Sequence, residues 1–354
     1  MTSEVSKKVA RTLSRFCIGA VLLMALTIGT IGTAVAKEKV RVGHFTWPGY
    51  GFLYVAQEKN LAPDLEFEFT IIEDPIQLFS LLSSGQLDVV FSTVEFGPIA
   101  TAEDMGFKLI SFTNLSNGTD NIVVRPDIKE ASDLIGQQIA ILEGGLSQIM
   151  VAIWLEENGV SVDDVQMVNL IAGDAAAAMT SGQIAAAELW DPFGAQVLAD
   201  LPGARSVSNS REDYWTKTGL IGDAIFMSDT FTIKHRDTAV KTTKAIFDAV
   251  EYWRANPVEA GKIIGDAIGF SEEDVASILV PTEDNGIYMY GLEQAGRFCG
   301  VLPGEAPFGQ PNGQAEANWN TTNDWWIKFG FMTKKVDFKE GTDCALLKEA
   351  YEAN

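Results

Sequence analysis

The sequence predicts an α/β protein with two lobes, each an open, mostly parallel sheet flanked by helices, and a two-strand hinge between them. Strand and helix patterns follow one another as β-α-β-α-β near the start of the chain. The same order recurs after about residue 124. Two extended segments, 121–126 and 223–229, stand where the chain would leave the first sheet and return to it.

The first half opens with an alternating strand over residues 39–45 and a helical pattern over 52–59. A second strand is expected at 65–72 and a second helix at 75–82. The third strand, 87–91, is nearly all apolar, which is typical of a strand buried in a parallel sheet.

The second half repeats this order, with strands expected at 138–142, 165–170 and 185–190 and helices at 147–157 and 175–181. An apolar strand at 224–227 then leads into a long amphipathic helix over 238–256. We therefore expect residues 37–122 and 226–354 to form a discontinuous first lobe and residues 123–225 to form the second.

Residues 1–36 have the layout of a secretory signal peptide. Four basic residues precede an apolar run from Phe16 to about Ile31, and Ala34-Val35-Ala36 supplies small residues for cleavage. The alternative is an uncleaved membrane anchor, since the run is about long enough to span a bilayer. The polar residues that follow Ala36 favour cleavage and a soluble protein in the periplasm.

The chain is strongly acidic, with a formal net charge of −22 over 354 residues. Removal of the basic leader makes the mature chain more acidic still. Partners that require basic patches, such as nucleic acid or an anionic membrane surface, are therefore excluded.

Cys299 and Cys344 are the cysteines left after cleavage, and an even pair in an exported chain predicts a disulfide. Two unpaired buried thiols are the alternative.

Several short motifs occur in an order typical of one protein family. They include Ser-Gly-Gln-Leu-Asp-Val at 84–89, Asp-Leu-Ile-Gly-Gln-Gln-Ile-Ala at 133–140 and Trp-Asp-Pro at 190–192. From Lys39 to about Pro257 the chain resembles the solute-binding proteins of the nitrate, aliphatic sulfonate, taurine and thiamine-precursor importers. Ala185 departs from the usual Asp of that family. The resemblance implies the type II periplasmic-binding-protein fold, a small polar ligand and an ABC transporter permease in the inner membrane.

Ligands of open α/β sheets bind beyond the carboxyl ends of the strands. The candidate residues stand at four such ends and beside the two expected crossings. Ser92, Thr93 and Ser147 have an alternative role as helix caps, and Trp47 and Tyr50 as core aromatics. The candidate ligand-binding residues are Trp47, Gly49, Tyr50, Ser92, Thr93, Glu95, Asp120, Gly145, Ser147, Glu188, Trp190, Asp191 and Asp223.

The chemistry of these candidates is mostly acidic and aromatic, with Arg125 as the one basic residue nearby in the sequence. Carboxylates and ring faces suit a cationic nitrogen. Glycine-rich helix starts suit a sulfonate or carboxylate at the other end of the ligand. We therefore expect taurine or a similar aliphatic sulfonate. The alternative is a cationic or neutral nitrogen compound, such as a guanidine, an amine, a pyrimidine or a thiamine precursor.

An enzymatic function is not expected from these residues. His44 and His235 are the two histidines, and neither belongs to a metal-ligand spacing. The sequence contains no nucleophile-elbow or phosphate-loop motif. We expect a monomeric binding protein with neither cofactor nor metal, and an enzyme on the same fold remains the remote alternative.

Overall fold

The computed structural model describes residues 37–282 and 286–353. The predicted signal peptide lies outside these residues. Within the described part of the chain, no helix is both long and apolar enough to cross a membrane.

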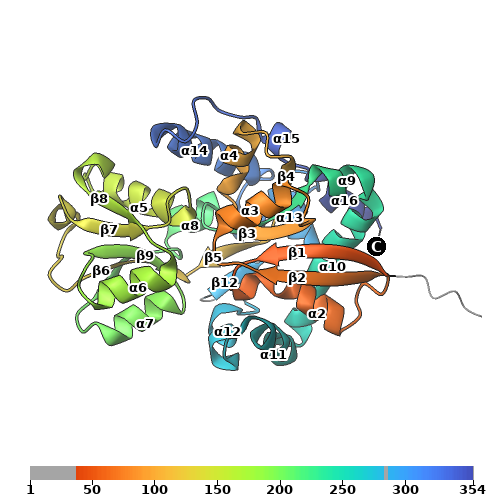
Figure 1. Cartoon of the computed structure of the whole chain (residues 1–354), viewed down its shortest axis with the longest axis horizontal. Helices are drawn as coiled ribbons and strands as arrows, with labels where there is room; N and C mark the ends of the chain where they lie inside the picture. The colour runs from red at the N-terminus through yellow and green to blue at the C-terminus, as the bar shows by residue number, and fades with distance from the viewer. Residues whose placement is uncertain (1–36, 283–285, 354) are drawn as a thin grey trace, which may run out of the picture. The chain divides into compact units, whose positions relative to one another are not determined.

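The first sheet has the strand order β2-β1-β3-β11-β4 (Figure 1). Strand β1 pairs in parallel with β2 and β3, whereas β11 is antiparallel to both β3 and β4. Four strands therefore run in one direction and the returning strand β11 opposes them. The bounds are β1 (Glu38–His44), β2 (Leu65–Ile71), β3 (Val89–Thr93), β4 (Phe107–Phe112) and β11 (Asp223–Ser228).

The second sheet repeats this topology, since its order read from the far edge is β8-β7-β9-β6-β10. Strand β7 is parallel to β8 and β9, and β6 is antiparallel to β9 and β10. The strand that runs against the others is β11 in the first sheet, beside β3, and β6 in the second sheet, beside β9. The bounds are β6 (Asp120–Val124), β7 (Gln138–Ile141), β8 (Gln166–Asn169), β9 (Ala186–Trp190) and β10 (Arg205–Asn209).

The chain passes between the two sheets slightly earlier than the sequence predicted. Segments 121–126 and 223–229 were expected to cross, but most of each belongs to a strand, β6 and β11 respectively. The crossings are residues 113–119 and 210–222. Within the first crossing, β5 (Asn114–Asn117) pairs with β12 (Gly286–Met289), so a C-terminal segment also joins this region. Residues 122–124 are apolar without interruption, which is typical of a strand buried on both faces.

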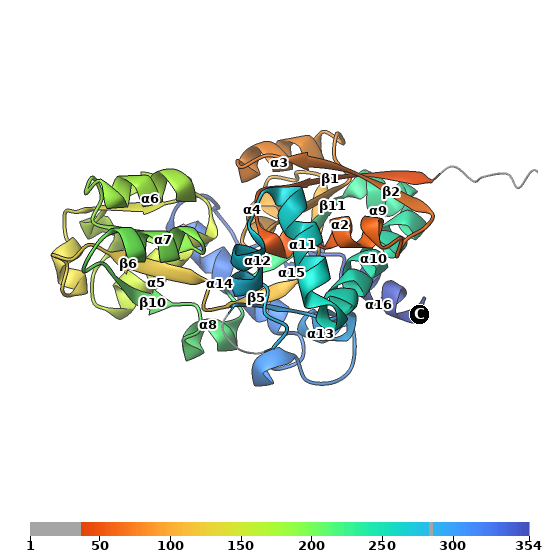
Figure 2. The ribbon, with the colours of Figure 1, turned by 90° about the horizontal axis from the view of Figure 1, so that it is seen from below.

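Helices cover both faces of the first sheet because its apolar residues alternate between the faces. Val89 and Phe91 pack with α2 (Phe52–Glu58), α10 (Arg236–Ala255) and α11 (Pro257–Ile268), while Val90 packs with α3 (Pro75–Ser83). Figure 2 shows α10 and α11 beside each other.

Strand β6 shows the same alternation in the second sheet. Ile122 and Val124 pack with α5 (Leu146–Glu157), and Val123 packs on the opposite face with α6 (Ala172–Thr180) and α7 (Phe193–Asp200). The second lobe is thus a sheet between one helix and a helix pair.

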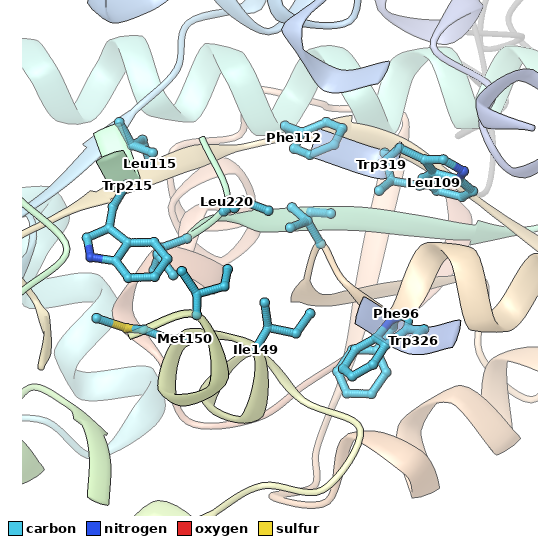
Figure 3. Close-up of a cluster of buried hydrophobic side chains, with 14 of the residues drawn as sticks. Phe96, Leu109, Phe112, Leu115, Ile149, Met150, Trp215, Leu220, Trp319 and Trp326 are labelled. Carbon is cyan, nitrogen blue, oxygen red and sulfur yellow. The ribbon is translucent and has the colours of Figure 1, made fainter. Parts of the chain in front are cut away.

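A large apolar cluster connects the C-terminal segment with both sheets (Figure 3). Trp319 and Trp326 are fully buried in it, and so are Ile149 and Met150 of α5. Cys299 and Cys344 form a disulfide, with Cα atoms 6.2 Å apart. The remaining helices are α4 (Phe96–Ala102), α8 (Asp213–Thr218), α9 (Asp229–Lys234), α12 (Glu272–Ile278), α13 (Leu292–Phe298), α14 (Gln314–Lys328), α15 (Phe338–Gly341) and α16 (Ala345–Glu352), and the 3-10 helices are η1 (Pro48–Tyr50), η2 (Ala131–Leu134), η3 (Val162–Asp164) and η4 (Pro307–Gly309).

Candidate functional site

The topology brings an acidic residue to the same position in each lobe. Because β6 and β11 run against their neighbours, each begins at the edge where the parallel strands end. Asp223 starts β11 directly opposite Thr93, the last residue of β3. Asp120 starts β6 directly opposite Trp190, the last residue of β9. Paired residues on adjacent strands share a face, so each acid lies beside the residue that ends the third strand.

A cavity of about 340 Å³ lies at these strand ends and is lined by residues from both sheets and both crossings. A cavity of this size suits a small organic ligand. Eight of the candidate residues predicted from the sequence line it, namely Trp47, Tyr50, Thr93, Asp120, Ser147, Glu188, Trp190 and Asp223.

Asp223 is almost fully buried and is surrounded by hydrogen-bond donors. Its Oδ2 accepts from Trp47 Nε1 at 2.9 Å and from Asn114 Nδ2 at 2.6 Å, and its Oδ1 accepts from Tyr50 OH at 2.8 Å. Burial raises the pKa of Asp223 to about 6, and the three donors act against that rise. At pH 7 this residue is therefore mostly ionised and supplies a negative charge.

Asp120 and Glu188 form a second acidic group, on adjacent strands of the other lobe. Asp120 pairs with Trp190, so Glu188 lies diagonally across from Asp120 on the adjacent strand, and both acids line the cavity. Asp120 Oδ2 accepts from Ser116 Oγ and from Thr119 Oγ1. Glu188 Oε1 is buried and has no hydrogen-bond partner. Burial raises the pKa of both residues, and the Asp120 charge adds to the rise at Glu188.

Aromatic rings form a continuous series across the cavity wall. Phe45 makes an edge contact with Tyr50, with ring centroids 4.9 Å apart, and lies 6.3 Å from the ring of Trp190. Trp190 in turn makes an edge contact with Phe193 at 5.9 Å. Phe45 and Tyr50 come from the first lobe and Trp190 and Phe193 from the second, so ring contacts join the two lobes at the site.

Two helix starts of the second lobe form another part of the wall. Leu146 and Ser147 of α5 and Ala172 and Gly173 of α6 line the cavity. Neither helix has a side-chain cap at its N-terminus. Uncapped N–H groups at a helix start offer partial positive charge to a ligand.

The cavity is acidic in its charged side chains. Its described lining contains Glu73, Asp120, Glu188 and Asp223 and no lysine, arginine or histidine. Arg125, the one basic candidate neighbour in the sequence, pairs with Asp127 away from the cavity. In the described chain, no group of three or more His, Cys, Asp or Glu residues is arranged to hold a metal ion.

Five predicted site residues do not line the cavity. Gly49 is buried under the Trp47 ring, and Gly145 precedes α5 as its N-cap. Ser92 is fully buried because strand alternation turns it to the face opposite Thr93. Asp191 Oδ1 accepts from the backbone N–H of Ala195 near the start of α7. Glu95 lies behind the wall, where its Oε1 accepts from Thr93 Oγ1 at 2.6 Å.

Glu95 nonetheless affects the electrostatics of the site. It is buried, and its Oε2 has no hydrogen-bond partner. Burial raises the pKa of Glu95 to about 8, with a smaller contribution from the charge of Asp223.

Other lining residues were missed by sequence reasoning. Asn114 and Ser116 belong to the first crossing, which the sequence suggested lies further along the chain. Ile287 reaches the cavity through the pairing of β12 with β5. Phe45 follows β1 and Phe193 follows β9 by three residues, and both line the cavity. An aromatic residue shortly after a strand was therefore the one signal that the sequence offered for these two positions.

Comparisons with known proteins agree with this architecture. A family model described as NMT1/THI5 like matches residues 47–260, more than half of the chain. A Brucella abortus protein named as a binding protein is 25% identical over 247 residues, covering 68% of this chain and 75% of that protein. A Bacillus subtilis protein named for binding aliphatic sulfonates is 24% identical over 336 residues, covering 92% of this chain and 91% of that protein.

Solved structures with the same fold include a binding protein and an enzyme. The alkanesulfonate-binding protein SsuA from Xanthomonas axonopodis pv. citri bound to MOPS has a TM-score of 0.67 at 17% identity, covering 88% of this chain and 99% of that one. The desulfurization enzyme DSZB has a TM-score of 0.62 at 15% identity, covering 90% and 99%. At these identities the likeness shows the fold alone, and the predicted fold class is confirmed.

Proposed function

The chain belongs to the NMT1/THI5-like family of solute-binding proteins, and from this premise we propose that it captures a small organic solute by a positively charged nitrogen and delivers it to an ABC importer. One observation carries the proposal. The described cavity lining holds four acids and no basic side chain, and Glu188 Oε1 is buried there without a partner. A buried carboxyl group of this kind is complemented by a cation or an N–H donor.

Rings beside these acids support the same ligand class. A cation over an aromatic face gains about 0.5 to 2 kcal/mol. Phe45 and Trp190 both line the cavity, so ring faces and carboxylates occur in one site. Nitrate or an aliphatic sulfonate without an amine would meet repulsion from Asp223 and find no basic partner among the described lining residues.

Taurine is a second, narrower candidate, and the helix starts favour it. Its ammonium group suits the acids, while the uncapped N-termini of α5 and α6 suit its sulfonate. Relatives named for sulfonate binding support this candidate. Guanidines, simple amines and aminopyrimidines would use the acids without needing the helix starts.

The proposed setting is the periplasm, reached through cleavage of the signal peptide predicted at residues 1–36. There the protein would act as a monomer, with the crossings at 113–119 and 210–222 dividing its two lobes, and would dock on a permease in the inner membrane. Capture without chemical change is part of the proposal, and incubation with a bound solute should yield no product by mass spectrometry.

A thermal-shift screen tests the proposed ligand class, because a ligand that binds the folded state raises its melting temperature. The panel contains guanidinium chloride, methylamine, taurine, ethanesulfonate and sodium nitrate at equal ionic strength. We expect guanidinium chloride and methylamine to raise the melting temperature. If binding also requires the helix starts, taurine should be the one compound of the panel that raises it. Stabilisation by ethanesulfonate or nitrate without any response to nitrogen cations would overturn the proposal.

A further inference from the structure

We infer, given the function proposed above, that Asp120 and Glu188 hold one proton between them in the free protein and exchange it for the charged nitrogen of the solute. The pair would thereby determine specificity, because it favours a strongly basic nitrogen cation over a neutral molecule of the same shape.

The first step concerns the positions of the two carboxyl groups. Both residues are deeply buried, with 7% of Asp120 and 5% of Glu188 exposed. An ionised carboxylate accepts hydrogen bonds and donates none. Asp120 and Glu188 lie diagonally across adjacent strands and line one cavity whose described lining has no basic side chain, so the two carboxyl groups cannot both ionise and share a proton.

The second step concerns where this proton lies. Asp120 receives hydrogen bonds from Ser116 and Thr119, which stabilise its ionised form. Glu188 Oε1 has no partner. The proton is thus held by Glu188, and the pair carries a single negative charge.

Among the described residues around the cavity, none carries a positive charge that would allow both groups to ionise. The titratable side chains near the pair are Glu95 before α4, Asp191 after β9, Asp223 of β11 and Tyr50 of η1. The charge of Asp120 contributes to raising the pKa of Asp191 and of Asp223. No lysine, arginine or histidine is among the described residues that line the cavity. The missing positive charge must come from the ligand.

The exchange is balanced in protons and charge. A guanidinium or ammonium ion enters with its own charge, the proton of Glu188 leaves for solvent, and two carboxylates then face one cation. One proton is released for each ligand bound. A weakly basic neutral heterocycle would instead accept the Glu188 proton, with none released. A neutral molecule that cannot be protonated would leave the proton in place.

Calorimetric titration in two buffers of different ionisation enthalpy counts these protons. Guanidinium chloride and taurine are the probes, at pH 7 and equal ionic strength. We expect about one proton released per bound ligand in the wild type and none in Glu188→Gln, in which an amide replaces the protonated acid. Glu273→Gln, which alters an exposed acid of α12, should match the wild type. Glu95→Gln should also keep the release, and its loss there would assign the proton to Glu95 and overturn the inference.

Infrared spectroscopy tests the stored proton without any ligand. Protonated carboxyl groups have a carbonyl stretching band separate from that of carboxylates. At pH 7 one such band should disappear in Glu188→Gln and be retained in Glu273→Gln. A free-protein spectrum unchanged by Glu188→Gln would overturn the inference. Glu95, whose pKa is about 8, has a band of its own at pH 7, so the stored proton is identified by the band that Glu188→Gln removes. Failure of every nitrogen probe to bind, with that band removed by Glu188→Gln, would instead contradict the proposed function and leave the stored proton established.

Discussion

The two lobes share one topology but treat the equivalent acid differently. Asp223 and Asp120 each begin the antiparallel strand of their sheet and lie at the cavity. Asp223 receives three donors from Trp47, Tyr50 and Asn114, and no other acid is hydrogen-bonded to it. Asp120 has two hydroxyl donors and an acidic neighbour, Glu188.

This difference shows that strand order sets where a carboxyl group lies, while its neighbours set its charge. Donors from indole, phenol and amide groups keep the first lobe's acid ionised. Asp120 of the second lobe shares a proton, because its neighbour is the carboxyl group of Glu188 and not a further hydrogen-bond donor. The cavity therefore has one permanent anion and one exchangeable proton.

The largest expected effect concerns the disulfide, which belongs to the first lobe. Cys299 and Cys344 are 45 residues apart in the C-terminal segment that packs on that lobe. Replacing both with serine should lower the free energy of unfolding by about 3 to 4 kcal/mol through loop entropy. Urea titration measures this loss. Ligand affinity should stay within about twofold of wild type, and a larger change would mean that the C-terminal segment also shapes the cavity.

The next effect concerns pH. The pKa values of Glu95, about 8, and of Asp223, about 6, lie above their unfolded values near 4.5 and 3.8. The folded protein therefore binds more protons than the unfolded chain between about pH 4 and 8. These groups cost stability as pH rises through that window. Between pH 5 and 8.5 the free energy of unfolding of the wild type should fall, and Glu95→Gln should make this fall smaller by about 2 to 4 kcal/mol.

Urea titrations of wild type and Glu95→Gln across this range measure the difference directly. The two stabilities should diverge in favour of the variant as pH rises. Parallel curves would mean that Glu95 is ionised at neutral pH. Glu273→Gln, at an exposed position, provides the matched control and should follow the wild type.

A third effect compares the acids of the two lobes as ligand anchors. Asp223→Asn removes a permanent charge and should weaken guanidinium or taurine binding by about a hundredfold, or roughly 2.7 kcal/mol. Glu188→Gln removes a group whose proton already offsets its charge and should weaken binding by about tenfold. Titration calorimetry at pH 7 measures both. The reverse order would show that the second lobe supplies the stronger anchor.

The smallest effect separates the two tryptophans of the site. Trp47→Phe deletes a hydrogen bond to a charged Asp223 and should cost about 1.5 to 3 kcal/mol of folding stability. Trp190 Nε1 has no partner in the free protein, so Trp190→Phe should cost less than about 1 kcal/mol. Melting temperatures of the two variants rank these costs. Equal losses would mean that the Trp47 hydrogen bond contributes little.

Local patterns in the sequence predicted much of this molecule. Strand β2 was expected at 65–72 and is Leu65–Ile71, and α5 was expected at 147–157 and is Leu146–Glu157. Period-two and helical spacing depend on neighbours a few residues away, so one sequence suffices to read them. The same alternation correctly put Glu188 and Trp190 together on one face at the end of β9.

The crossings and the partners of each acid required the tertiary structure. Asp223 and Trp47 are 176 residues apart in sequence, and Asn114 and Asp223 are 109 apart. Nothing local distinguishes Asp120, paired with Glu188, from Asp191, bonded to the N–H of Ala195. By itself the sequence determined that acids and rings stand at strand ends. Which acid is ionised, and which holds a proton, depends on donors that only the packing of distant segments brings within reach.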